Sequence, residues 1–168
     1  CLIFIIYTQY VRWNIKDWLA LVGFVVFSEG AGVLGSVFTV PSIAGWYATL
    51  AKPEIAPPNW IFGPVWTTLF LLMGIAAFLV WRKNKNLEMA LSVFTLQLGL
   101  NVLWSFLFFS LHSPLAALVE IVLLWLAIAA TIWIFFKTSK AAAWLLVPYI
   151  AWVSFAGYLN FLLWVLNS

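Results

Sequence analysis

Three polar side chains recur every four residues in an otherwise apolar part of the chain. They are Gln97, Asn101 and Ser105, and Leu, Val and Phe dominate the residues around them. Residues four apart share one face of a helix, so these groups form a single polar stripe, with Trp104 and Phe108 beside it. Such a stripe must face protein or a cavity rather than lipid. Hydrogen bonding between helices and a polar patch in a binding pocket explain it equally well.

Two further stretches place aromatic rings at helical spacing. Trp66 and Phe70 are four residues apart and share a face, as do Trp152, Ala156 and Asn160. The first pair is also what ordinary packing between helices requires. The second series, a ring followed by a small residue and an amide, suits the wall of a slot for a flat molecule.

A carboxyl group occurs in the middle of an apolar stretch at Glu29. A carboxylate at that depth of a bilayer costs at least ~2.5–3.5 kcal/mol on insertion scales. We therefore expect Glu29 to be protonated or hydrogen-bonded to a neighbouring helix. The alternative is a proton site in a small proton-linked transporter. Glu120 is expected about two turns from the outer end of its helix, closer to water.

Patterns for metal, phosphate or triad chemistry are missing. The only histidine, His112, falls between two apolar stretches, and Cys1 is the only cysteine, so we expect no metal site within the bundle. There is no Gly-rich phosphate loop and no Ser–His–Asp set. We expect no required cofactor, and the aromatic, weakly polar interior favours binding of a flat, apolar molecule over catalysis.

Composition assigns the chain to membrane proteins. Of its 168 residues 66% are hydrophobic and 8% charged, with a mean hydropathy of +1.10, which is outside the range of soluble domains. The net charge of +3 resides in short connections, so it indicates topology rather than nucleic-acid binding. Twelve Trp, fifteen Phe and five Tyr exceed what interfacial belts require, so some rings must line the interior.

Five stretches are long enough to cross a bilayer as helices, since a span needs ~20 apolar residues. None alternates in the manner of barrel strands, so the predicted fold class is all-α, a polytopic five-helix bundle. Pro148 should kink the last span or loosen one of its turns. We expect a single domain, residues 18–168, after a leader at 1–17 on the cytoplasmic side. The predicted spans are 18–38, 60–81, 87–111, 114–136 and 141–166.

The longest connection, residues 39–59, is rich in proline. Pro53, Pro57 and Pro58 fix φ and disfavour helix before them, so the stretch from Trp46 should be an extended, stiff loop suited to a lid. Pro64 is expected in the first turn of the following helix, where its missing N–H costs little.

Basic residues are distributed unequally between the two sides. On one side of the membrane Lys52 is the only expected Lys or Arg residue. This bias predicts a cytoplasmic N-terminus, with the first loop and the C-terminus on the opposite side. The basic residues expected on the cytoplasmic side are Arg12, Lys16, Arg82, Lys83, Lys85, Lys137 and Lys140.

Small residues recur every four positions in the first span, at Ser28, Gly32 and Ser36. This spacing lets two helices approach closely, either inside the subunit or across a homodimer.

The chain resembles the TspO/translocator protein family, also called tryptophan-rich sensory proteins or peripheral-type benzodiazepine receptors. The resemblance covers the chain from about Glu29 to its C-terminal end and is specific in its first-loop motif. The residues that carry it are Trp46-Tyr47, Leu50, Lys52-Pro53, Pro57-Pro58, Trp60, Gly63-Pro64-Val65-Trp66, Gln97-Leu98, Asn101, Trp104, Phe108-Phe109, Pro148-Tyr149, Trp152, Phe155-Ala156 and Leu159-Asn160.

The resemblance implies five transmembrane helices, a dimer, and a cavity under the first loop that binds porphyrins, sterols and benzodiazepine-type ligands. It implies that the cavity is lined by Trp66, Asn101, Trp104, Trp152 and Ala156, with Tyr47 and Lys52 contributed by the lid. Phe70 and Phe108 are added from the aromatic faces described above. The animal family's sterol motif is missing, because Phe161 stands at its tyrosine position and no basic residue follows. A bacterial-type member is therefore expected.

Three functions follow as hypotheses. The first is a membrane sensor or carrier that binds a porphyrin such as protoporphyrin IX or haem. A free-base porphyrin fits better, since no helix offers an axial histidine. The second is an enzyme that degrades protoporphyrin IX with light and oxygen, in which the resemblance implies that Trp66 and Trp152 take part. The third is the proton-linked transporter that would use Glu29.

Overall fold

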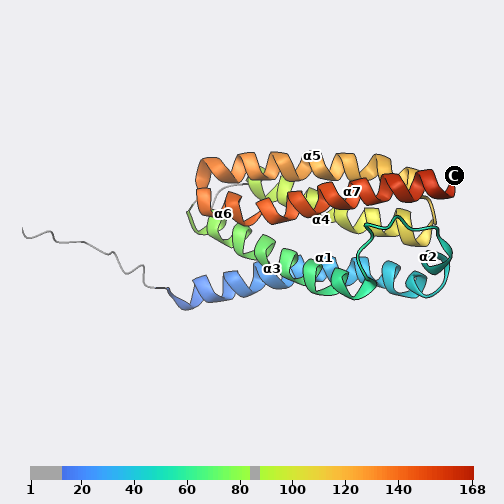
Figure 1. Cartoon of the computed structure of the whole chain (residues 1–168). Helices are drawn as coiled ribbons and strands as arrows, with labels where there is room; N and C mark the ends of the chain where they lie inside the picture. The colour runs from blue at the N-terminus through green and yellow to red at the C-terminus, as the bar shows by residue number, and fades with distance from the viewer. Residues whose placement is uncertain (1–12, 84–87) are drawn as a thin grey trace, which may run out of the picture.

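The computed structural model describes residues 13–83 and 88–168, and within them the chain is helical and without strands. Five helical segments are long and apolar enough to cross a membrane, which confirms the predicted fold class. Figure 1 shows them packed side by side as one elongated bundle. Cys1, Arg12 and Lys85 lie outside the described residues. The elements are α1 (Ile15–Ile43), α2 (Trp46–Thr49), α3 (Asn59–Lys83), α4 (Glu88–Ser105), the π-helix η1 (Phe106–Ser110), α5 (Pro114–Thr138), α6 (Lys140–Leu145) and α7 (Val147–Asn167).

The first helix begins with a capping box. The Asn14 side chain accepts from the Asp17 backbone N–H at 2.9 Å, and the Asp17 carboxylate accepts from the Asn14 N–H at 3.1 Å. Asp17 is also 4.0 Å from Arg82 of α3 and is only 8% exposed. Asp17 therefore joins the ends of α1 and α3.

The first connection is shorter and more helical than predicted. The first helix continues through Pro41 to Ile43, and Trp46–Thr49 forms a helical turn, so the extended part covers only residues 50–58. The next helix starts at Asn59, which places Pro64 inside it rather than in its first turn. The proline therefore removes one backbone hydrogen bond near the helix end, where Thr68 Oγ1 donates to its carbonyl at 2.8 Å.

The third and fifth spans depart from regular α-helix. The third ends in the π-helix η1, where the Leu111 N–H donates to the Phe106 carbonyl at 3.0 Å. The fifth is broken at Leu146 into α6 and α7, and Pro148 lies in the first turn of α7. The predicted effect of Pro148 is confirmed, because the last span is interrupted at Leu146, two residues before it. In the first turn of α7 the missing N–H of the proline costs little.

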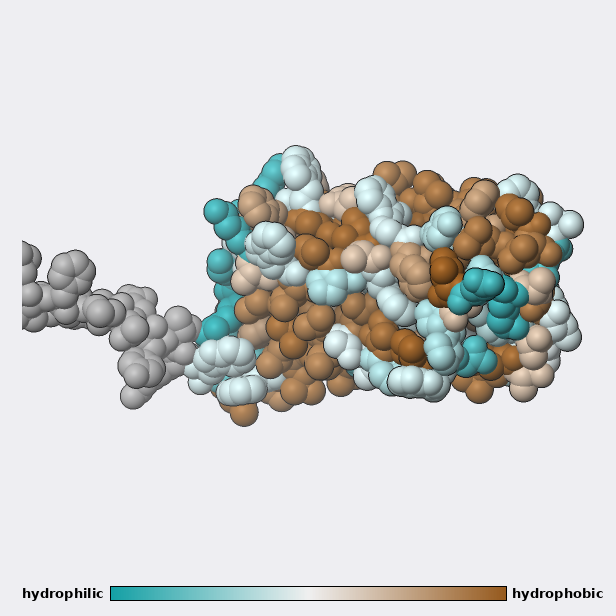
Figure 2. All heavy atoms as spheres, in the orientation of Figure 1, coloured by the Kyte–Doolittle hydropathy of each residue, from teal (hydrophilic) through white to brown (hydrophobic). Residues whose placement is uncertain are grey.

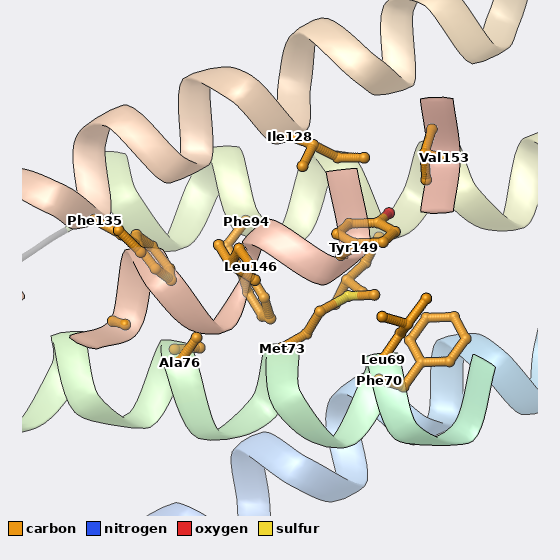
Figure 3. Packing of buried hydrophobic residues seen from close by; sticks show 14 of the residues in the cluster. Leu69, Phe70, Met73, Ala76, Phe94, Ile128, Phe135, Leu146, Tyr149 and Val153 are labelled. Carbon is orange, nitrogen blue, oxygen red and sulfur yellow. The ribbon is translucent and has the colours of Figure 1, made fainter. Parts of the chain in front are cut away.

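The core lies where α3, α4, α5, α6 and α7 meet, as Figure 3 shows for Met73, Phe94, Ile128 and Tyr149. Close packing of α1 on α3 depends on Gly74, because a Cβ there would lie 2.6 Å from the Val25 Cα.

The predicted series of small residues in α1 faces the bundle interior only in part. Ser28 is buried, Gly32 is half-buried against Phe70, and Ser36 is exposed, while Ala31 and Gly35 next to the series are also buried. The homodimer stays a prediction.

Charged groups gather at one end of the bundle. Figure 2 shows hydrophilic residues where the chain enters α1, a smaller hydrophilic patch toward the opposite end, and a mainly apolar surface between them. The C-terminus lies at the end that carries α2, as Figure 1 shows. This arrangement is that of an integral, multi-pass membrane protein.

Candidate ligand-binding cavity

A cavity of about 480 Å³ lies between α1, α3, α4, η1 and α7 and reaches Tyr47 of α2. Its volume is within the range of small-molecule sites, about 300–1,000 Å³. Eight of the nine predicted ligand-binding residues line it: Tyr47, Trp66, Phe70, Asn101, Trp104, Phe108, Trp152 and Ala156. Residues from helices far apart in sequence thus converge on one site.

Lys52 is the predicted residue that does not line the cavity. Its Nζ donates to the carbonyls of Ala48 and Leu50 at 3.3 and 3.2 Å, and it lies 4.8 Å from the centre of the Tyr47 ring. The ammonium group therefore stabilises the end of α2, and it reaches the cavity only through Tyr47.

One group of rings comes from α3 and α7. Trp66 stacks on Phe70 with ring centroids 5.6 Å apart, and its edge meets Tyr149 at 6.2 Å. Phe62 makes an edge contact with Trp152 at 5.8 Å. Such contacts fix ring orientation in the absence of a ligand, so this part of the lining is preorganised.

A second group of rings comes from α4, η1 and α2. Trp104 and Phe108 are stacked 5.1 Å apart with planes inclined by 19°, and Phe108 meets Phe109 edge-on at 4.9 Å. Tyr47 of α2 lies 5.7 Å from Phe109. Phe108 and Phe109 of the π-helix η1 are both buried.

Hydrogen bonds hold the polar side chains of the lining. Asn101 Nδ2 donates to the Tyr149 hydroxyl at 3.1 Å, joining α4 to α7. Trp104 Nε1 donates to Asn160 Oδ1 at 3.1 Å, and Asn160 Nδ2 donates to the Pro114 carbonyl at 2.8 Å. The polar stripe therefore takes part both in contacts between helices and in the cavity wall, the two interpretations that the sequence left open.

The stripe's other members differ in their roles. Ser105 lines the cavity and packs against Gly35, whose added Cβ would lie 3.2 Å from the Ser105 hydroxyl. Gln97 is 1% exposed, and its Nε2 lies 3.9 Å from the Met73 sulfur. Gln97 therefore belongs to the core rather than to the cavity.

The two glutamates of the spans, Glu29 and Glu120, lie in different environments. Glu120 is 4% exposed, and both of its carboxyl oxygens are buried without a hydrogen-bond partner among the described residues. The expectation that it lies close to water was wrong, because it faces the bundle with Ala117 and Leu124. Glu29 lines the cavity and makes no hydrogen bond within the described part of the chain, so of its two expected states the hydrogen bond to a neighbouring helix is not seen.

The lid is attached to the end of α7. The Asn167 side chain accepts from the Ala51 backbone N–H at 2.9 Å and donates to the Ala51 carbonyl at 3.0 Å.

Burial raises the pKa of the Tyr47 phenol above its usual value of about 10. The lid therefore presents a neutral phenol to the cavity at physiological pH.

The cavity opens on the side formed by α1 and α3. Several of its lining residues on these helices are exposed, among them Val33 at 63%, Val40 at 64% and Trp60 at 73%. These positions are in or next to the apolar band, so the opening faces the region that lipid occupies.

Sequence reasoning missed part of the lining. It gave the small residues of α1 a packing role only, whereas Gly32, Gly35 and Thr39 also line the cavity. It also omitted Phe62 and Phe109. The helical spacing of Phe62 with Trp66 could have indicated the former, since residues four apart share a face.

No three His, Cys, Asp or Glu side chains come together as metal ligands within residues 13–83 and 88–168.

The chain matches known proteins over most of its length. The model of the TspO/MBR family matches residues 24–165. A tryptophan-rich protein TspO of Chlorobaculum tepidum is 49% identical over 140 residues, 81% of this chain and 88% of that protein. A protein of the same name from Archaeoglobus fulgidus is 44% identical over 89% of this chain and 98% of its own length. The translocator protein of Bos taurus is 38% identical over 90% and 92%. The chain therefore belongs to the TspO/MBR family.

Proposed function

We propose that the chain is a membrane receptor or carrier for a flat, apolar tetrapyrrole such as free-base protoporphyrin IX. The observation that carries the proposal is the cavity of about 480 Å³, whose lining takes aromatic rings from α2, α3, α4, η1 and α7. A macrocycle offers two apolar faces, and stacking on Trp and Phe is the favourable way to bury them. The names of relatives support a role in sensing or transport.

The polar groups suggest how such a ligand would be oriented. Lys52 lies over the ring of Tyr47, which lines the cavity. A macrocycle whose propionates point toward α2 would have this ammonium group beside its negative charges. The apolar edge of the macrocycle would then enter between Trp66 and Trp152.

Fluorescence quenching tests this proposal. Purified protein in detergent is titrated in the dark with protoporphyrin IX while tryptophan emission is recorded. We expect saturable quenching that is weakened in Trp66→Phe and in Trp152→Phe. Trp144→Phe is the matched control, because Trp144 is 68% exposed on the outer surface and does not line the cavity. Quenching that does not saturate, or that all three variants reduce equally, would contradict the proposal.

A second function is light-dependent breakdown of the bound porphyrin by dioxygen. It is supported by one observation, that Trp66 and Trp152 both line the cavity. The test is illumination of the protein–porphyrin sample in air, with free porphyrin in the same detergent as reference. Faster loss of the porphyrin absorption band with protein than without it, abolished by either Trp→Phe change, supports an enzyme. Equal loss rates rule it out.

A further inference from the structure

Glu29 occupies a particular place in the cavity. It is the middle residue of α1, so it lies about 21 Å along the helix from Ile43 at the lid end, at 1.5 Å per residue. Among the lining residues of α1 it is the one farthest from the lid. Phe70, Asn101 and Trp152 are the corresponding deepest lining residues of α3, α4 and α7. We call these four residues the cavity floor.

The lining of the cavity contains an acidic side chain and no basic one among the described residues. Glu29 is the only carboxyl group among the described lining residues, and no Lys, Arg or His is among them. Lys52, on the lid, donates to backbone carbonyls and lies over the Tyr47 ring, and it does not line the cavity. A negative group that reaches the floor would therefore meet a carboxyl group and no cation.

Several hydrogen-bond donors of the lining are used within the protein, whereas the Trp152 Nε1–H on the floor is buried without a hydrogen-bond partner among the described residues. The Ser36 hydroxyl donates to the Val33 carbonyl at 2.7 Å, and the Thr39 hydroxyl donates to the Gly35 carbonyl at 3.0 Å. Five lining side chains donate to the protein itself, namely Ser36, Thr39, Asn101, Trp104 and Asn160. The carboxyl oxygens of Glu29, in contrast, have no donor among the described residues.

We propose that Glu29 is a specificity-determining residue of this cavity, and that it selects flat, apolar ligands that carry a basic nitrogen or another strong hydrogen-bond donor on their leading edge. The proposal rests on the proposed function to the extent that the cavity is the ligand site. A ligand ammonium group at the floor would supply the donor that Glu29 lacks, in a region of low dielectric where such a bond is strong. A ligand carboxylate there would be disfavoured, so propionates would have to face the lid.

The test uses three probes that share one flat ring and differ in charge: 1-pyrenemethylamine, 1-methylpyrene, which carries no donor, and 1-pyrenecarboxylate. Binding to the full chain in detergent is followed by energy transfer from tryptophan to pyrene. The variants are Glu29→Gln, which keeps the size of the side chain and removes its charge, and Glu54→Gln. Glu54 is exposed on the lid and does not line the cavity, so it controls for the change in net charge. Comparing variants in the same detergent cancels the partitioning of each probe into micelles.

We expect Glu29→Gln to weaken binding of the amine about 10- to 100-fold, the value of a charge-assisted hydrogen bond. The same change should strengthen binding of the carboxylate and leave binding of 1-methylpyrene within about twofold, which also shows that the variant is folded. Glu54→Gln should alter none of the three. Amine and carboxylate affinities that are the same in Glu29→Gln and the wild type would overturn the proposal.

Two other results separate this proposal from the proposed function. If the pyrenes show the expected dependence on Glu29 but protoporphyrin IX does not bind, the tetrapyrrole function fails and the selectivity stands. If no pyrene binds, the cavity does not admit a flat ring, and the selectivity proposal is overturned.

Discussion

Gly74→Ala should destabilise the bundle more than any neutral Gly→Ala change on its surface. The added Cβ would lie 2.6 Å from the Val25 Cα and 2.9 Å from the Phe24 carbonyl oxygen, and both are backbone atoms of α1. Neither can rotate away, so α1 and α3 must separate. Overpacking of this kind costs about 1–3 kcal/mol, and a backbone obstacle places it near the upper end. The better helix propensity of alanine returns about 1 kcal/mol, which leaves a net loss of about 2 kcal/mol.

The matched control is Gly99→Ala. Gly99 lies in α4, is exposed, and has no neighbouring atom within 4 Å of the point where a Cβ would lie, so the same substitution should gain up to about 1 kcal/mol. The assay is reversible unfolding in mixed micelles, followed by tryptophan fluorescence. The two variants should differ by about 3 kcal/mol, roughly a hundredfold in the unfolding equilibrium constant. Equal stabilities would refute the inference that α1 and α3 touch at Gly74.

Four further predictions concern the lining, the lid and the orientation. Asn160→Leu removes the acceptor of Trp104 Nε1 and should lower the free energy of unfolding by about 1–3 kcal/mol, measured in the same assay. Asn167→Leu removes the hydrogen bonds between α7 and Ala51, so it should increase proteolysis of residues 50–58 without a comparable loss of unfolding free energy. Tyr47 should ionise only above pH 10 in an ultraviolet titration, because burial raises its pKa. Its contribution to stability is therefore present below pH 10 and is lost as the pH rises further. Tyr47→Phe should remove both this titration and this loss of stability at high pH. In a cysteine-free background, Lys52→Cys and Lys140→Cys should react with an impermeant thiol reagent from opposite sides of the membrane, Lys140→Cys from the cytoplasm; reaction from one side would contradict the orientation.

Helical periodicity predicted much of the site. Trp152 and Ala156 were placed on one face by their spacing, and Asn101 by its place in a polar stripe, and all three line the cavity. Spacing along a helix is set by backbone geometry, which is the same in every helix, so the sequence carries this information locally.

Glu120 shows what was misjudged. Its distance from the helix end suggested contact with water, but its angular position was decisive: it shares a face with Leu124 and Ile128, four and eight residues on, and that face is buried. For such a residue, the direction in which it points from the helix determines burial more than its depth does.

Tertiary contacts account for the rest of what the sequence did not indicate. The π-helix η1 has no local signature in Phe106–Ser110, and it is held by a contact 67 residues away, in which the Ser42 hydroxyl donates to the Phe109 carbonyl at 2.7 Å. Likewise, Asn167 fixes Ala51 across 116 residues. The shape of the lid depends on such distant partners, which spacing within a segment does not reveal.

The central claim is that the flat ligand occupies the cavity between the helices, and filling the cavity tests it most directly. The measurement is the dissociation constant for protoporphyrin IX of Ala156→Phe beside that of Ala151→Phe. Ala156 lines the cavity, whereas Ala151, on the same helix, is exposed on the outer surface. We expect Ala156→Phe to weaken binding about tenfold or more and Ala151→Phe to bind like the wild type. Equal binding by the two variants would show that the porphyrin does not occupy this cavity.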